Sequence, residues 1–116
     1  MKIFFILIIF ISNSIYAGMS VKDYQEFKKD KNSLEWYLLG LGNGFGFSNT
    51  ELQTRNITSI YCPPPDLKLT KEMLQRMLEK RIKEISNKPG YENLQIEPML
   101  LSKLTELYPC TSKIKS

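Results

Sequence analysis

The stretch TKEMLQRMLEKRIKEI, residues 70–85, predicts the fold more clearly than any other part of the chain. Thr70 has the residue type of a helix N-cap, and Glu72 in the first turn suits the positive end of the helix dipole. Apolar residues then recur every three or four positions, which places them on one face of a helix. These residues are Met73, Leu74, Met77, Leu78, Ile82 and Ile85. A stripe of this kind is typical of a protein core rather than of a cofactor site.

Three further segments carry helical patterns. A short one begins at the N-cap candidate Ser20, a second runs from about Leu34 to Leu52, and a third begins near Pro98, a residue type favoured at the start of a helix. Ile60-Tyr61 is too brief to indicate a strand, and no internal repeat or second domain is evident. The sequence therefore predicts an all-α fold, a single domain over residues 18–116 built as a small bundle of four to five helices.

The first 17 residues resemble a cleavable export signal. Lys2 is followed by an almost unbroken apolar run over residues 3–11, and Ala17 is a small residue of the kind that precedes a cleavage site. An uncleaved membrane anchor is the alternative, but the run is well short of the roughly 20 residues that span a bilayer. We expect cleavage after Ala17, release into the periplasm and no stable membrane insertion. Gly18 in place of a cysteine excludes a lipid anchor at that position.

The chain has two cysteines, Cys62 and Cys110, and both lie in the expected exported part. Disulfides form and persist outside the cytoplasm. A bridge that closes a loop of about 49 residues should stabilise the fold by roughly 4 kcal/mol in the chain-entropy model. The alternative, a reactive thiol, needs a base or a cation nearby. Three prolines follow Cys62 and the chain has no histidine, so we predict a structural disulfide.

Four glycines interrupt the second helical pattern, and each costs about 1 kcal/mol of helix propensity relative to alanine. They are Gly40, Gly42, Gly44 and Gly46. Their spacing matches neither the dinucleotide fingerprint nor the phosphate-binding loop. Gly40 and Gly44 are one helical turn apart, so they would leave a flat strip that another backbone can approach. We predict that Tyr37, Gly40 and Gly44 form a helix-packing seam, within the monomer in preference to across a homodimer.

The residue types argue against catalysis. Without histidine, Ser-His, Cys-His and His-metal chemistry are excluded. A carboxylate pair could work in principle, but most of the 12 acidic residues have basic partners at helical spacing. We therefore expect no enzyme activity, no cofactor and no metal. The net charge of +4 is small and evenly spread, so a nucleic-acid partner is not expected. Of the functions considered, surface recognition of another protein is the one that we expect.

Three short motifs resemble the Rap and Tai immunity proteins of type VI secretion systems. Residues 37–44, YLLGLGNG, resemble the Tyr-x-x-Gly-x-x-Asp/Glu-Gly core of that family. Residues 61–64, YCPP, and residues 107–110, LYPC, resemble its aromatic-Cys-x-Pro and Phe-Pro-Cys landmarks. The resemblance covers about Leu34 to Cys110. It departs at Asn43, where the family often has an acid, and at Leu34, where many members have a cysteine that pairs with one in the first helix.

The resemblance implies a small, helical, periplasmic and often dimeric protein that binds a peptidoglycan-cleaving amidase effector and covers its catalytic cleft. A single bridge in place of two implies a looser first helix. The alternative, from another class of function, is a periplasmic helical binding or chaperone-like module with no toxin partner. A secreted effector is a third, which the missing catalytic groups disfavour.

The connection between the last two helical segments is the candidate effector contact. It is polar, contains Pro89-Gly90, and carries Tyr91, an aromatic type enriched at interfaces. The candidate contact residues are Asn87, Lys88, Tyr91 and Glu92. An ordinary helix connector is the competing and favoured interpretation of the same residues.

Overall fold

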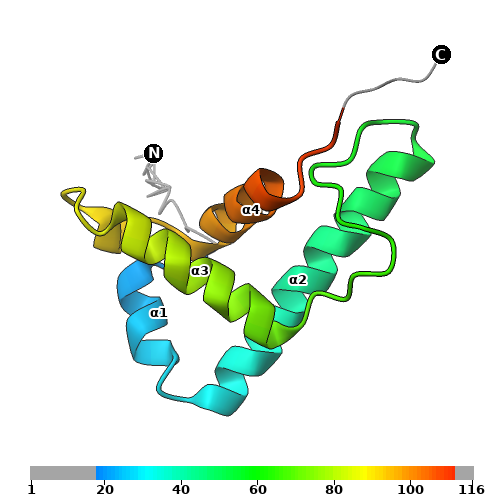
Figure 1. Cartoon of the computed structure of the whole chain (residues 1–116). Helices are drawn as coiled ribbons and strands as arrows, with labels where there is room; N and C mark the ends of the chain where they lie inside the picture. The colour runs from blue at the N-terminus through cyan, green and yellow to red at the C-terminus, as the bar shows by residue number, and fades with distance from the viewer. Residues whose placement is uncertain (1–17, 112–116) are drawn as a thin grey trace, which may run out of the picture.

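A computed structural model describes residues 18–111, and in this range the chain forms four α-helices and one 3-10 turn (Figure 1). The elements in chain order are α1 (Val21–Phe27), α2 (Lys31–Thr54), α3 (Lys71–Ile85), η1 (Tyr91–Asn93) and α4 (Ile96–Leu107). The all-α prediction is confirmed. The predicted leader over residues 1–17 lies outside the described residues, and so do the last five residues of the predicted domain.

Side-chain caps set the starts of the first three helices. Ser20 Oγ accepts a hydrogen bond from the Asp23 amide, and Thr70 Oγ1 accepts one from the Met73 amide, at 3.1 and 3.2 Å. Both N-cap predictions are thus confirmed. Asp30 caps α2 in the same way through the Ser33 amide, at 3.2 Å. The helix therefore begins at Lys31, three residues before the predicted start.

The helix α4 begins at Ile96, two residues before Pro98. The Ile96 amide donates to the Met19 carbonyl at 2.9 Å, so the residues before α1 pair with the residues before α4. Pro98 consequently stands in the first turn rather than at its first position. A proline is tolerated there because the amides of the first turn have no partner within the helix.

The helix α3 packs against both α4 and α2, and its predicted apolar face is confirmed as part of the core. Leu74, Met77, Leu78 and Ile82 are buried, and Met73 and Ile85 are partly buried against them. The other buried apolar residues come from every other α-helix and from the chain that precedes α3. They are Val21, Tyr24, Leu34, Leu38, Tyr61, Ile96, Met99, Leu100 and Leu104.

Polar contacts tie α1 and α4 to α3. The Tyr24 hydroxyl donates to Glu79 at 2.7 Å, and Lys28 reaches the same carboxylate at 3.4 Å, so α1 is held without a disulfide of its own. Lys103 of α4 has a side chain only 3% exposed, and its ammonium group lies 3.1 Å from Glu84 and 3.2 Å from Glu106. Its charge is thereby paired on both sides, as a buried cation requires.

The predicted disulfide between Cys62 and Cys110 is confirmed, with 4.9 Å between the two Cα atoms. It joins the chain after α4 to the segment that connects α2 with α3, residues 55–70. The Cys62 amide also donates to the Tyr108 carbonyl, at 2.8 Å. Figure 1 shows this connecting segment returning beside the C-terminal half of α2. That half of α2 projects past α3, so the connecting segment is its main neighbour.

Candidate protein-docking groove

The predicted seam within the monomer is wrong for Gly40 and Gly44. A Cβ atom built on either residue would meet no atom beyond the helix's own backbone within 4 Å. The close approach is instead at Gly42, where a Cβ would lie 2.7 Å from Leu74 Cδ1. The reason is the orientation of α2, which turns Leu34 and Leu38 to the core. Tyr37, the third predicted seam residue, is only partly buried and donates its hydroxyl proton to Glu97 of α4.

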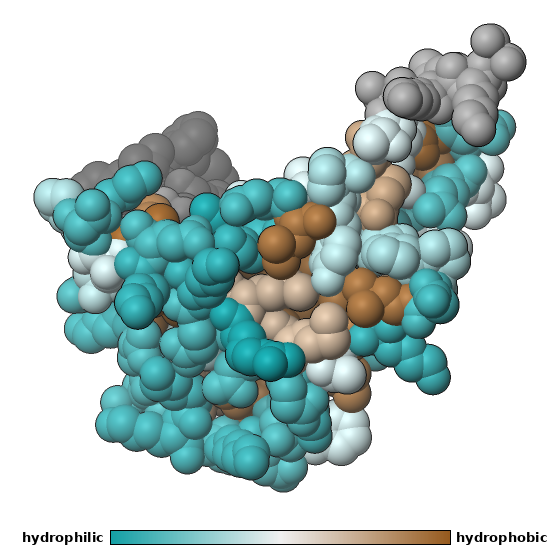
Figure 2. All heavy atoms as spheres, viewed as in Figure 1, coloured by the Kyte–Doolittle hydropathy of each residue, from teal (hydrophilic) through white to brown (hydrophobic). Residues whose placement is uncertain are grey.

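The side of α2 that carries Gly40 is exposed and partly apolar. Trp36 is 69% exposed and Phe47 is 74% exposed, whereas large apolar side chains in a small domain are mostly covered. With Gly40 and Asn43 they recur at spacings of three and four, so the four residues share one helix face. In Figure 2, hydrophilic residues cover most of α1 and α3, while neutral and apolar residues gather over α2 and the connecting segment.

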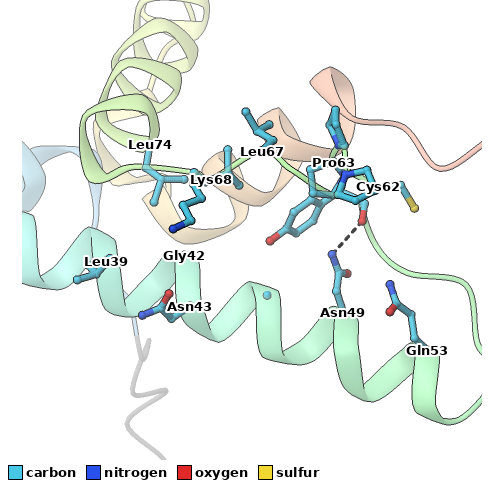
Figure 3. Close-up of a pocket in the computed structure, with 15 residues that line it drawn as sticks. Leu39, Gly42, Asn43, Asn49, Gln53, Cys62, Pro63, Leu67, Lys68 and Leu74 are labelled. Atoms are coloured by element: carbon cyan, nitrogen blue, oxygen red, sulfur yellow. Dashed lines mark hydrogen bonds between the residues drawn. The ribbon is translucent and has the colours of Figure 1, made fainter.

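A groove of about 710 Å³ separates α2 from the connecting segment (Figure 3). Gly46 leaves space along the helix side of the groove, since a Cβ built on it meets no atom within 4 Å, whereas Leu74 packs against Gly42. The opposite wall is apolar and stiff, since three consecutive prolines restrict the backbone. We call this site the α2 groove; its residues are Leu39, Gly42, Asn43, Gly46, Asn49, Gln53, Tyr61, Cys62, Pro63, Pro64, Pro65, Leu67, Lys68, Leu69 and Leu74.

Amide side chains of α2 hold this wall in place. Asn49 is buried, and its Nδ2 donates to the Tyr61 carbonyl at 2.8 Å, the bond drawn in Figure 3. Its Oδ1 accepts from the Ile60 amide at 2.9 Å. One turn further on, Gln53 Nε2 donates to Ser59 Oγ at 2.9 Å. Together with the disulfide at Cys62, these bonds fix the connecting segment over residues 59–62, where the wall begins.

We predict that Asn49→Ala lowers the free energy of unfolding by about 1–3 kcal/mol, because it leaves the Ile60 amide and the Tyr61 carbonyl without their partner. Chemical denaturation of oxidised protein measures the effect. The Thr50→Ala variant is the matched control, since Thr50 is exposed and bonds only to a carbonyl of its own helix. Equal stability of the two variants would contradict the anchoring role of Asn49.

The charge of the α2 groove is one-sided. Lys68 is the only charged residue among those that line it, and no carboxylate lines it. Within residues 18–111, Lys68 makes no salt bridge, whereas Lys71, three residues later, pairs with Glu35 at 2.9 Å. Burial raises the pKa of Tyr61, so its phenol stays neutral at physiological pH. One cation, the exposed amide of Asn43 and apolar walls complement a segment that presents both an apolar side chain and a carboxylate.

The predicted effector-contact residues lie at the other end of α3. Asn87, Lys88 and Glu92 are exposed around a turn in which Gly90 has a φ of 78°, a backbone conformation that favours glycine. Tyr91 is partly buried and packs against the core, so much of its ring is already covered. The structure does not bring these four residues to the α2 groove.

Sequence reasoning missed Trp36, Phe47 and the groove. A signal was present, because Trp36 and Phe47 share a face that lies opposite Leu34 and Leu38. An apolar residue on each side of one helix indicates that one side faces the core and the other faces solvent or a partner. The pattern does not distinguish the side that faces the core from the side that is exposed.

Residues 18–111 contain no candidate metal cluster and no candidate membrane span. No group of three His, Cys, Asp or Glu residues there could hold a metal ion. No helix of that range is long and apolar enough to cross a bilayer. Comparison with family models, with curated proteins and with solved structures finds no match to this chain.

The exposed glycines give a second prediction. Gly44→Ala should raise the free energy of unfolding by about 1 kcal/mol, because alanine is the better helix former and its methyl group meets no neighbour. Thermal unfolding at several protein concentrations measures it. A homodimer seam along Gly40 and Gly44 remains a prediction of the sequence. If the variant instead melted earlier, and more so at high concentration, Gly44 would be packed against a second copy.

Proposed function

We propose that the chain is a periplasmic immunity protein that binds and inhibits a peptidoglycan-cleaving amidase effector of a type VI secretion system. One observation carries the proposal. The three motifs that resemble the Rap and Tai family are far apart in the sequence, yet two of them line the α2 groove and the third is bonded to its wall. Residues 37–44 contribute Leu39, Gly42 and Asn43, residues 61–64 contribute half of the opposite wall, and residues 107–110 end at the cysteine that anchors that wall.

The site suits binding of a protein better than binding of a small molecule. It is an open groove beside an exposed helix face, so a loop in the α2 groove could be flanked by contacts to Trp36 and Phe47. Aromatic residues of this kind supply much of the binding energy at protein interfaces. The disulfide and the prolines hold the wall before the partner arrives, which lowers the entropic cost of association.

Titration of the mature, oxidised protein into the amidase encoded by the neighbouring gene tests the proposal. We expect hydrolysis of peptidoglycan peptides to fall to background near one equivalent, with a complex in gel filtration. An amidase from an unrelated effector system is the control and should keep its activity. Full activity of the neighbouring enzyme in excess mature protein, with no complex, would refute the proposal.

A periplasmic helical binding or chaperone-like module is the second candidate. The exposure of Trp36 and Phe47 favours it, since such side chains could also bind apolar segments of many clients. The two candidates differ in selectivity. A chaperone-like module should delay aggregation of several unrelated unfolded proteins, whereas an immunity protein should bind one folded enzyme and leave such clients unaffected.

A further inference from the structure

Glu97, in the first turn of α4, has one carboxylate oxygen in use and one without a partner. Its Oε1 accepts the Met19 amide at 2.7 Å and also the hydroxyl of Tyr37. Its Oε2 is buried and has no hydrogen-bond partner, and no salt bridge reaches Glu97 in the part of the chain that the structure describes. The dipole of α4 stabilises a negative charge here. It still leaves a desolvated oxygen unpaired, which is costly.

Backbone pairing fixes Gly18 beside that oxygen. The Met19 carbonyl accepts the Ile96 amide and the Val21 amide donates to the Leu94 carbonyl, both at 2.9 Å. Ser20 and Gln95 form the antiparallel bridge between these bonds. A Cβ built on Gly18 would lie 2.9 Å from Glu97 Oε2. The Gly18 nitrogen is two covalent bonds from that point, about 2.5 Å.

We propose that cleavage after Ala17 creates a binding partner for Glu97: the new α-ammonium group of Gly18 forms an ion pair with the Oε2 atom. Two independent observations meet at this residue. The sequence pattern predicts Gly18 as the first residue after cleavage, and the fold places an unpaired carboxylate oxygen beside Gly18. Once the preceding peptide bond is hydrolysed, the ammonium group can turn toward the carboxylate by rotation about a single backbone bond.

The residue type at position 18 also suits this ion pair. A Cβ there would also lie 1.8 Å from Gln95 Oε1, so a side chain would displace Gln95. Glycine lets the terminus lie against both residues. Export and the final stability of the fold are then linked, because the positive charge at this position exists only in the cleaved chain. This inference depends on the cleavage site and not on the identity of the binding partner.

The test compares two oxidised proteins, one that begins at Gly18 and one that begins at Ala17. The extra residue moves the ammonium group by about 3.6 Å along an extended chain. We expect the extension to raise the equilibrium constant for unfolding about 5- to 30-fold, as loss of a partly buried ion pair would. In a Glu97→Gln background the two forms should be equally stable. The Tyr37→Phe variant is the control; it keeps Oε2 and should keep the effect of the extension.

The charge can be followed directly by NMR titration of the Gly18 nitrogen. We expect the pKa of the α-amino group to lie above its usual range of about 7.7–8.0. The facing titratable groups are Glu97 and Tyr37, and burial together with the hydrogen bond to Glu97 raises the pKa of Tyr37 well above its usual value, so it stays neutral. The extra stability should be complete below about pH 7.7 and lost as pH rises through the folded pKa.

Three results would overturn the inference. N-terminal sequencing of periplasmic protein could find another cleavage site. The extension could destabilise the Glu97→Gln variant as much as the natural sequence, which would indicate a steric effect alone. The α-amino pKa could also be the same in the natural protein and in Glu97→Gln.

Discussion

Loss of the Cys62–Cys110 disulfide should lower the free energy of unfolding by about 4 kcal/mol, because the two cysteines are 48 positions apart and the bridge restricts the unfolded chain accordingly. For a domain of this size, the melting temperature should fall by about 15 °C or more. This loss is a large share of the total stability, because the core of so small a domain is itself small. Differential scanning calorimetry with and without reductant measures it.

The double variant Cys62→Ala/Cys110→Ala separates the bridge from the reductant. It should be destabilised like the reduced protein and should not respond to further reductant. A second consequence is local. The wall of the α2 groove would keep its hydrogen bonds to Asn49 and Gln53 but lose the disulfide. Backbone amides near Cys62 should therefore exchange their hydrogens faster with solvent. Equal melting temperatures with and without reductant would show that the bridge does not stabilise the fold.

Filling the α2 groove should weaken partner binding strongly without harming the fold. Gly46→Leu adds a side chain where no atom lies within 4 Å of the new Cβ, and it replaces a poor helix former with a good one. We expect the stability to stay equal or to rise by up to about 1 kcal/mol. Affinity for the amidase should fall at least 30-fold, equivalent to about 2 kcal/mol, since a loop could no longer enter beside α2.

Gly44→Leu is the matched control for that experiment. It makes the same chemical change two residues away on the same helix, at a glycine that has no neighbour and does not line the groove. It should gain the same helix propensity and retain affinity. Isothermal titration calorimetry of both variants against the amidase gives the comparison. Equal losses in the two variants, or none in Gly46→Leu, would exclude the groove as the docking site.

The sequence was sufficient to predict those features for which each local signal has a single structural interpretation. Residues 70–85 carry a cap, an acidic residue in the first turn and an apolar stripe that agree with one another, and α3 forms as predicted. Two cysteines leave only one intramolecular pairing, so the connectivity of the disulfide followed from their number. The helix depends on residues that are close in the chain, and the disulfide connectivity depends on the number of cysteines. Neither prediction requires the tertiary structure.

The orientation of α2 could not be predicted because apolar residues surround it. Leu34 and Leu38 on one side, Tyr37, Leu41 and Phe45 on the adjoining side and Trp36 with Phe47 on the opposite side all offer a helical face. Tertiary packing selects the first, and the adjoining side is only partly buried. The groove was equally hidden, since it exists only where the connecting segment returns beside two glycines. Spacing identified the glycines but could not say what lies opposite them.

Hydrogen–deuterium exchange of the mature protein, alone and with one equivalent of the neighbouring-gene amidase, tests most directly that this fold acts by holding a protein partner in the α2 groove. We predict slower exchange over residues 39–46 and 61–69, with residues 87–92 unchanged. Unaltered exchange along the whole chain, or protection confined to residues 87–92, would contradict the account.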